Sequence, residues 1–104
     1  VCSSDLKKTF QDSLRGLQDS VLVDFFAEWC KPCQRMKPAL KNIQNRFINK
    51  MSLWRIDADR ETELCKQLSI DALPVLQLYV KGIKVWEHRG YISEEAICSE
   101  LNLH

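Results

Sequence analysis

The sequence predicts an α/β protein, because segments with strand composition alternate along the chain with segments of helical spacing. Three observations carry this prediction. The apolar run 21–26 leads into a helical pattern at 34–47, and the strand-like segment 51–58 is followed by a second, short helical pattern. Toward the carboxyl end, two more strands meet at Lys81 and Gly82, a pair typical of a hairpin turn.

Composition indicates one globular domain that spans residues 1–104. Hydrophobic residues make up 45% of the chain and charged residues 28%, as in ordinary proteins that fold around a single core. The formal net charge is +1, so neither nucleic acid nor an acidic membrane surface is expected as a partner. No apolar run approaches the ~18 residues that a transmembrane helix needs. We expect a monomer.

Before the first strand, apolar residues recur at helical spacing and predict a helix over residues 4–17. Ser3 or Ser4 can cap this helix. The chain begins without an initiator methionine, so we expect that upstream residues have been removed. Cys2, followed by two serines, is either the remnant of a lipid-anchored export signal or a chance arrangement, and no hydrophobic signal region decides between the two.

Two cysteines, Cys30 and Cys33, stand where the strand 21–26 gives way to the helix 34–47. A thiolate at the start of a helix meets unpaired N–H groups and the positive end of the helix dipole, which lowers the pKa of Cys30. Cys33 lies one turn further on the same side, close enough to close a disulfide with Cys30. A C-x-x-C pair beside a strand–helix unit indicates thiol redox chemistry.

Half of a zinc site is the alternative interpretation of this pair. Zinc would need two further ligands at usable spacing, and the remaining candidates form no second C-x-x-C or H-x₃-H pair: Cys65, Cys98, His88 and His104. Redox chemistry is therefore favoured. The chain has five cysteines, an odd number that leaves at least one unpaired and favours a reducing compartment.

One carboxylate, Asp24, interrupts the apolar run 21–26. Burying it in the ionised form is unfavourable, so a functional reason is the better interpretation, and the alternative is a position at a frayed strand end. In the helix that follows, Pro32 falls in the first turn, where its missing N–H matters little. Pro38 lies inside the same helix and is expected to kink it.

The strand 51–58 places Arg55 on one of its two faces. The short helix after it is predicted at 61–68, and Cys65 within it is interpreted as a small core residue rather than a redox partner.

The hairpin strands are predicted at 75–80 and 84–88, with His88 exposed and chemically inert. Ser93 is expected to cap a last helix that covers the sheet, and Cys98 within that helix is interpreted as structural.

The segment VDFFAEWCKPC resembles the signature of the thioredoxin family, in which a tryptophan precedes the first cysteine. Two further pieces follow the family pattern: Asp24 matches its buried aspartate, and Leu73-Pro74-Val75 matches the segment where the family proline is cis. The resemblance covers nearly the whole chain. It implies a mixed central β-sheet with helices on both faces, whose N-terminal edge strand, for which only residues 1–3 remain, is short or absent.

The resemblance implies reversible thiol–disulfide exchange, most often the reduction of protein disulfides. The Cys30 thiolate would attack a substrate sulfur, and Cys33, deprotonated with help from Asp24, would release the reduced product. Arg55 matches a position where many thioredoxins carry a lysine directed toward the buried aspartate; the alternative is a solvated edge charge. Lys31 replaces the common glycine and is expected to favour the Cys30 thiolate.

In the family, the loop before the cis-proline packs against the dithiol, and the residue ahead of the proline offers its backbone to an extended substrate. That residue is Leu73 here, and it belongs to an expected apolar rim around Cys30 made by Trp29, Ala72, Leu73, Val75 and Tyr91, next to Pro74. The resemblance implies no metal and no organic cofactor. Electrons would come from a thioredoxin reductase or a membrane dithiol donor.

Two alternatives to a disulfide reductase stay open. One is an exported disulfide oxidant or isomerase of the same fold, and the other is a thioredoxin-fold module that binds a partner. A cytoplasmic location is expected for the reductase, whereas a periplasmic or lipid-anchored location would follow if an export signal has been removed.

Overall fold

The computed structural model describes residues 10, 12–14 and 20–103. Within these residues, four strands form one sheet in the order β2-β1-β3-β4. The strands are β1 (Ser20–Phe26), β2 (Ser52–Asp57), β3 (Val75–Val80) and β4 (Ile83–Arg89), and the helices are α2 (Lys31–Arg46), α3 (Thr62–Gln67) and α4 (Glu94–Glu100).

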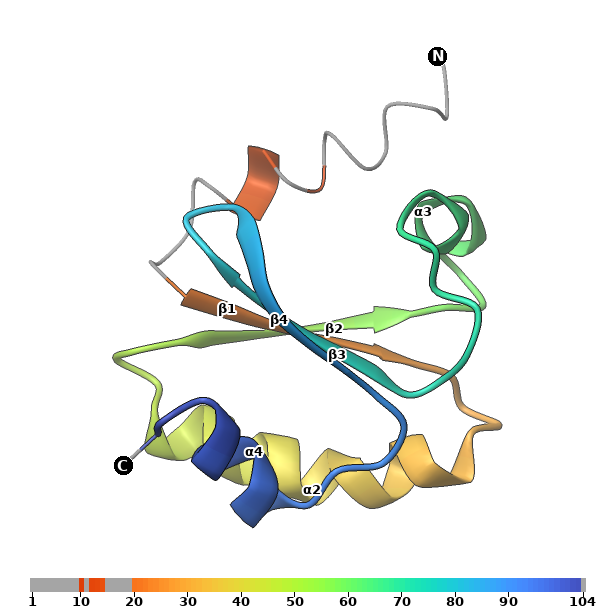
Figure 1. Cartoon of the computed structure of the whole chain (residues 1–104). Coiled ribbons are helices and arrows are strands. Elements are labelled where there is room, and N and C mark those ends of the chain that lie inside the picture. The colour runs from red at the N-terminus through yellow and green to blue at the C-terminus, as the bar shows by residue number, and fades with distance from the viewer. Residues whose placement is uncertain (1–9, 11, 15–19, 104) are drawn as a thin grey trace.

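The sheet is mixed, as predicted. Strand β1 is its central element, parallel to β2 on one side and antiparallel to β3 on the other, and β3 continues antiparallel to β4. Helices α2 and α4 cover one face, and α3 lies on the other (Figure 1). The chain thus has the α/β architecture with helices on both faces that the alternating pattern predicted.

Alternation along β1 distributes its side chains between two hydrophobic clusters. Val21, Val23 and Phe25 pack with Leu14 and Leu64 on the α3 face. Leu22 packs on the opposite face with Met36, Leu40 and Ile43 of α2. Because the strand is buried on both faces, its sequence is a continuous apolar run. Asp24 shares the face of Leu22, because side chains two residues apart point the same way, and therefore faces α2.

Most predicted boundaries differ from the observed ones by one to three residues. Helix α2 begins at Lys31 rather than at residue 34, because Cys30 acts as its N-cap and Pro32 is tolerated in the first turn. Pro38 lies inside the helix, as expected. Of the helix predicted at 4–17, Phe10 and residues 12–14 are described and helical. The remainder of that helix, and the edge strand considered at residues 1–3, lie outside the described residues.

The hairpin between β3 and β4 turns at the predicted pair. Lys81 has φ 53° and Gly82 has φ 83°, which are the left-handed conformations of a type I′ turn. The expectation that His88 is exposed was wrong: it is half-buried, its ring stacks on Trp86 with an interplanar angle of 14°, and its Nε2 lies 3.3 Å from the carbonyl oxygen of Tyr91.

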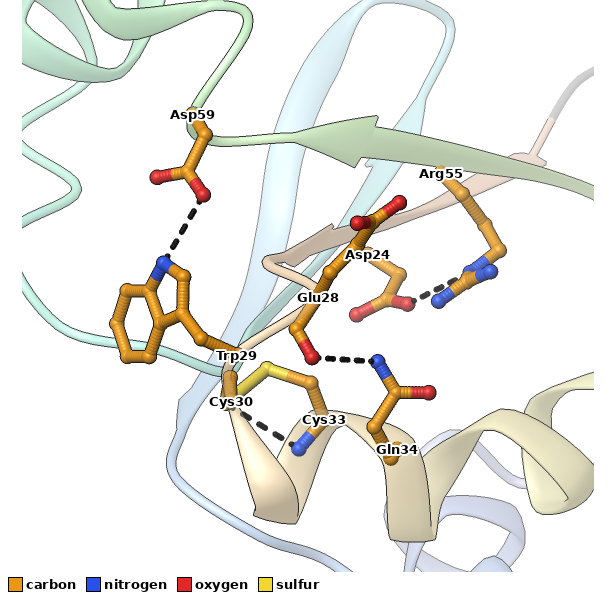
Figure 2. The surroundings of a disulfide bond; sticks show 8 residues. All are labelled: Asp24, Glu28, Trp29, Cys30, Cys33, Gln34, Arg55 and Asp59. Atoms are coloured by element: carbon orange, nitrogen blue, oxygen red, sulfur yellow. Dashed lines mark hydrogen bonds and ion pairs between the residues drawn. A yellow bond between two sulfur atoms is a disulfide. The ribbon is translucent and has the colours of Figure 1, made fainter.

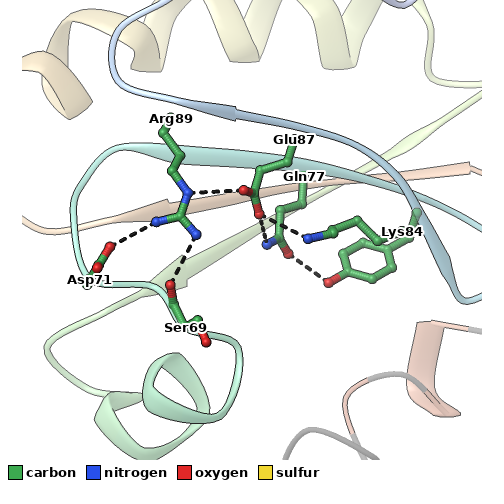
Figure 3. Close-up of polar contacts among 7 residues, drawn as sticks. Ser69, Asp71, Gln77, Lys84, Glu87 and Arg89 are labelled. Atoms are coloured by element: carbon green, nitrogen blue, oxygen red, sulfur yellow. Dashed lines mark hydrogen bonds and ion pairs between the residues drawn. The ribbon is translucent and has the colours of Figure 1, made fainter.

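A polar network crosses the sheet from β3 to β4 (Figure 3). The Tyr79 hydroxyl donates to Oε1 of the buried Gln77 at 2.7 Å, and Nε2 of Gln77 donates to Glu87 Oε1 at 2.7 Å. Lys84 Nζ donates to the same Glu87 oxygen at 3.2 Å, and Arg89 Nε donates to Glu87 Oε2 at 3.0 Å. Burial alone would raise the pKa of Glu87, but these hydrogen bonds and the Lys84 charge lower it to about 2.

We expect Glu87→Gln to reduce the acid sensitivity of the fold. A carboxylate whose pKa is depressed from 4.5 to about 2 stabilises the folded state above pH 4.5, and this contribution is lost as the pH falls toward 2. The free energy of unfolding should therefore decline less steeply between pH 4.5 and pH 2 in the variant. Denaturant titrations over this range measure the difference, with the exposed Glu95→Gln as control. Parallel curves for wild type and Glu87→Gln would contradict the prediction.

Candidate active site

The dithiol lies at the start of α2, directly after the loop that leaves β1. Cys30 and Cys33 form a disulfide with their Cα atoms 5.2 Å apart, and both residues are buried. The backbone N–H of Cys33 donates to Cys30 Sγ at 3.3 Å (Figure 2). The Cys30 sulfur thus takes the N-cap position of the helix, where N–H groups and the helix dipole favour a negative charge.

The segment ahead of β3 packs against the cysteines. Leu73, Phe26 and Ala27 contact the pair Cys30–Cys33 in one hydrophobic cluster. The Leu73–Pro74 peptide bond is cis, as the resemblance implied. The backbone N–H of Gly90, which follows β4, donates to the Pro74 carbonyl at 2.8 Å and ties this segment to the sheet.

Trp29 stands beside the dithiol with 69% of its surface exposed. Its Nε1 donates to Asp59 Oδ2 at 2.9 Å (Figure 2). Asp59 was not among the predicted site residues, although a signal was present in the sequence. Trp29 follows β1 and Asp59 follows β2, and the carboxyl ends of adjacent parallel strands meet at the same edge of a sheet. This contact holds the indole in place beside Cys30.

The expected apolar rim is correct in outline and wrong for one member. Trp29, Ala72 and Tyr91 are exposed, and Leu73 is half-buried. Val75 is completely buried, because it begins β3 with its side chain in the cluster on the α3 face. Its side chain is thus not part of the rim. A recess of about 240 Å³ opens between Trp29 and the segment ahead of β3, and its walls include Trp29, Asp59, Cys65, Ala72 and Leu73.

Asp24 is buried, with only 1% of its surface exposed. Its Oδ2 accepts a hydrogen bond from Arg55 Nε at 3.1 Å, while its buried Oδ1 has no hydrogen-bond partner in the described part of the chain. Burial raises the pKa of Asp24, and the hydrogen bond and charge of Arg55 oppose that rise only in part.

Arg55 is the ion-pair partner of Asp24 rather than a solvated edge charge. The two residues are register partners in the parallel pair β1–β2, so their side chains lie on the same face of the sheet. The Arg55 side chain is 28% exposed, and its guanidinium carbon lies 4.0 Å from the centroid of the Phe26 ring. This cation–π contact fixes the guanidinium beside the carboxylate.

Outside the dithiol, Cys65 is buried and Cys98 half-buried, and both are free thiols. Burial, with a smaller contribution from the Glu61 charge, raises the pKa of the Cys65 thiol, which makes its reactive thiolate scarce. Within residues 10, 12–14 and 20–103, no group of three or more His, Cys, Asp or Glu side chains is arranged to hold a metal ion. None of the helices described there is long and apolar enough to span a membrane.

A redox-active disulfide at a helix N-terminus, packed against a cis-proline loop, defines a thiol–disulfide oxidoreductase. The family model described as Thioredoxin matches residues 2–102. The chain therefore belongs to the thioredoxin family, and its enzymatic activity is that of a protein-disulfide reductase.

Individual relatives match nearly end to end. Thioredoxin 1 of Chlorobaculum tepidum is 25% identical over 96 residues, which cover 92% of this chain and 95% of the relative. The thioredoxin of Callithrix jacchus is 33% identical over 92 residues, which cover 88% of this chain and 87% of the relative. The structure of Plasmodium falciparum thioredoxin superposes with a TM-score of 0.78 at 30% identity, covering 88% of this chain and 87% of its own.

Proposed function

We propose that the chain reduces disulfides in protein substrates with Cys30 as the attacking thiolate and Cys33 as the resolving thiol. The observation that carries this assignment is the hydrogen bond from the Cys33 N–H to Cys30 Sγ. The N-cap position gives Cys30, and not Cys33, the direct stabilisation of the helix terminus. We assign the whole reaction to one thioredoxin domain, residues 1–104, acting as a monomer.

In the first step, the reduced Cys30 thiolate attacks one sulfur of the substrate disulfide. A mixed disulfide forms, and the other substrate sulfur leaves as a thiolate that takes a proton from solvent. In the second step, Cys33 gives its proton to the Asp24 carboxylate and attacks Cys30 Sγ. The second substrate thiolate leaves. The substrate disulfide has then gained two electrons, and the two cysteines have lost two electrons in forming the Cys30–Cys33 disulfide. A raised pKa, due mainly to burial, suits Asp24 to accept this proton.

Substrate binding is assigned to the exposed Trp29 and the half-buried Leu73, while Pro74 and Val75 are buried and are assigned the role of holding the Leu73 backbone in place. The exposed indole of Trp29 and the recess of about 240 Å³ beside it support this assignment. An extended polypeptide would pair with the Leu73 backbone and place its disulfide over Cys30. A thioredoxin reductase or a membrane dithiol donor would restore the dithiol, and we propose the cytoplasm as the compartment.

Insulin reduction, combined with a measurement of the reduction potential, tests this proposal. We expect catalytic reduction of insulin with dithiothreitol as electron donor, and a potential well below those of oxidants and isomerases, which lie at ≈ −120 to −180 mV. Failure to reduce insulin would indicate a binding module. Turnover at a potential in the range of the oxidants would indicate an exported oxidant or isomerase instead.

We expect Lys31→Gly to lower the reduction potential by roughly 10–20 mV. Lys31 is the exposed first residue of α2, next to Cys30. Its charge stabilises the thiolate, which exists only in the reduced protein, by ~0.5–1 kcal/mol, and ~1.4 kcal/mol corresponds to ~30 mV for a two-electron couple. Equilibration with glutathione at low salt measures the shift. Lys31→Gln should give the same shift without the backbone freedom of glycine, and the exposed Lys41→Gln should give none. An unchanged or higher potential in both Lys31 variants would contradict the prediction.

A further inference from the structure

Arg89, at the end of β4, binds three acceptors from two separate parts of the chain. Its Nε donates to Glu87 Oε2 at 3.0 Å, its Nη1 to Asp71 Oδ1 at 2.8 Å and its Nη2 to the backbone carbonyl of Ser69 at 3.1 Å (Figure 3). Every nitrogen of the guanidinium is therefore engaged. The planar fork of arginine can make this set of contacts, whereas the single ammonium of lysine cannot span it.

Two of these acceptors belong to the segment that leads to the active site. Ser69 and Asp71 lie just ahead of Leu73, which packs against the dithiol. The Asp71 side chain is 84% exposed, so its position is not set by packing in the core. Ser69 has φ 60°, a left-handed conformation at which the chain changes direction after α3. Arg89 thus holds the exposed part of this segment through two contacts, one to the Asp71 side chain and one to the Ser69 backbone.

Glu87, the third acceptor of Arg89, is held in place by further hydrogen bonds. Glu87 accepts hydrogen bonds from Lys84 and from the buried Gln77 as well as from Arg89. The residue after Arg89, Gly90, bonds through its N–H to the Pro74 carbonyl at 2.8 Å. The end of β4 therefore fixes the segment on both sides of Leu73.

We propose that Arg89 is a positioning residue that sets the place of the segment Asp71–Leu73 relative to the dithiol, and so favours extended protein disulfides over small ones. This inference rests on the proposed role of the Leu73 backbone in substrate binding. A protein substrate must pair with that backbone, whereas a small disulfide needs only to reach Cys30. The Asp71 side chain is exposed, and exposed ion pairs add little to stability, so loss of the contact between Arg89 and Asp71 should appear in substrate binding more than in unfolding.

The test compares two substrates in Arg89→Lys and Arg89→Met. Pre-reduced protein is mixed with excess insulin or with hydroxyethyl disulfide, and the single-turnover rate is followed against substrate concentration. For insulin, we expect the half-saturating concentration to rise about three- to tenfold while the limiting rate stays within about twofold. For hydroxyethyl disulfide the rate should be unchanged, as should the reduction potential. Arg60→Lys is the matched control, because Arg60 is an exposed arginine in a 3.9 Å ion pair with Asp57 and lies outside this segment.

Asp71→Ala tests the same contact from its exposed side and avoids any change in β4. It should reproduce the selective effect on insulin. An equal loss with both substrates, a shifted potential, or a wild-type half-saturating concentration in Arg89→Lys would overturn the proposal. If the wild type itself fails to reduce insulin, the proposed function falls, and this inference with it; if the wild type reduces insulin and the variants match it, only the role of Arg89 falls.

Discussion

Cys30→Ser should abolish disulfide reduction, whereas Cys33→Ser should stop the reaction after its first half. Without the Cys30 thiolate no attack occurs, and the rate should fall by at least about 10³-fold, the scale seen when an enzyme loses its nucleophile. Cys33→Ser keeps the attacking thiolate at the N-cap of α2 but cannot resolve the mixed disulfide. It should accumulate covalent complexes with protein substrates, which non-reducing electrophoresis detects.

The matched control for this pair is Cys98→Ser, which removes a free thiol on α4, the helix that packs over the sheet. It should turn over insulin at the wild-type rate and trap nothing. Alkylation of the reduced protein at neutral pH gives an independent measurement, in which Cys30 should be labelled before Cys33. Faster labelling of Cys33, or trapping by Cys30→Ser, would reverse the two roles.

Asp24→Asn should stabilise the protein at pH 7 and slow its turnover. Burial raises the pKa of Asp24, so the ionised carboxylate destabilises the fold at pH values above that raised pKa. The neutral amide removes the cost of burying the charge, while the atom in the place of Oδ1 stays without a hydrogen-bond partner among the described residues. The variant should gain a free energy of unfolding of roughly 0.5–3 kcal/mol at pH 7. Its turnover should slow because the amide cannot accept the Cys33 proton.

The gain in stability of Asp24→Asn should depend on pH. Protonation removes the charge from the wild-type carboxyl, so the advantage of Asp24→Asn should shrink as the pH falls through the raised pKa and vanish below the ordinary value of 3.8. Arg55 remains partly solvated and stacked on Phe26 in the variant, so its own charge is not stranded. Denaturant titrations at pH 7 and at pH values below 3.8 measure both points. The exposed Glu95→Gln should show no such gain. A variant no more stable than wild type at pH 7 would mean that Arg55 fully compensates the buried charge.

The features that local sequence could predict are those set by neighbouring residues. The position of the dithiol at the start of a helix, the hairpin turn at Lys81 and Gly82 and the buried character of β1 all follow from residues within a few positions of each other. The burial of Asp24 was predictable as well, because this residue stands inside an apolar run; its role in proton transfer stays a prediction.

Features that depend on which elements become neighbours were harder to predict. The face on which Val75 lies depends on how β3 packs against β1, so its burial was missed. The hydrogen bond between Trp29 and Asp59 spans 30 residues, and that between Arg89 and Asp71 spans 18. Pairs of exposed polar residues so far apart carry no periodic signal, and their contact follows only from the sheet order.

The ion pair between Asp24 and Arg55 also bears on how the active site exchanges protons with water. Arg55 borders a recess of about 150 Å³ whose other walls come from Lys37, Lys41, Gln44 and Leu53, so water approaches the pair from the side where α2 crosses β2. None of these residues belongs to the surface around Trp29 and Leu73. In the proposed mechanism, a polypeptide lying across that surface would leave the recess open, so a proton taken up by Asp24 would have a route to bulk water beside Arg55 while the polypeptide is still bound. In that mechanism, the proton and the substrate therefore reach the active site by different routes.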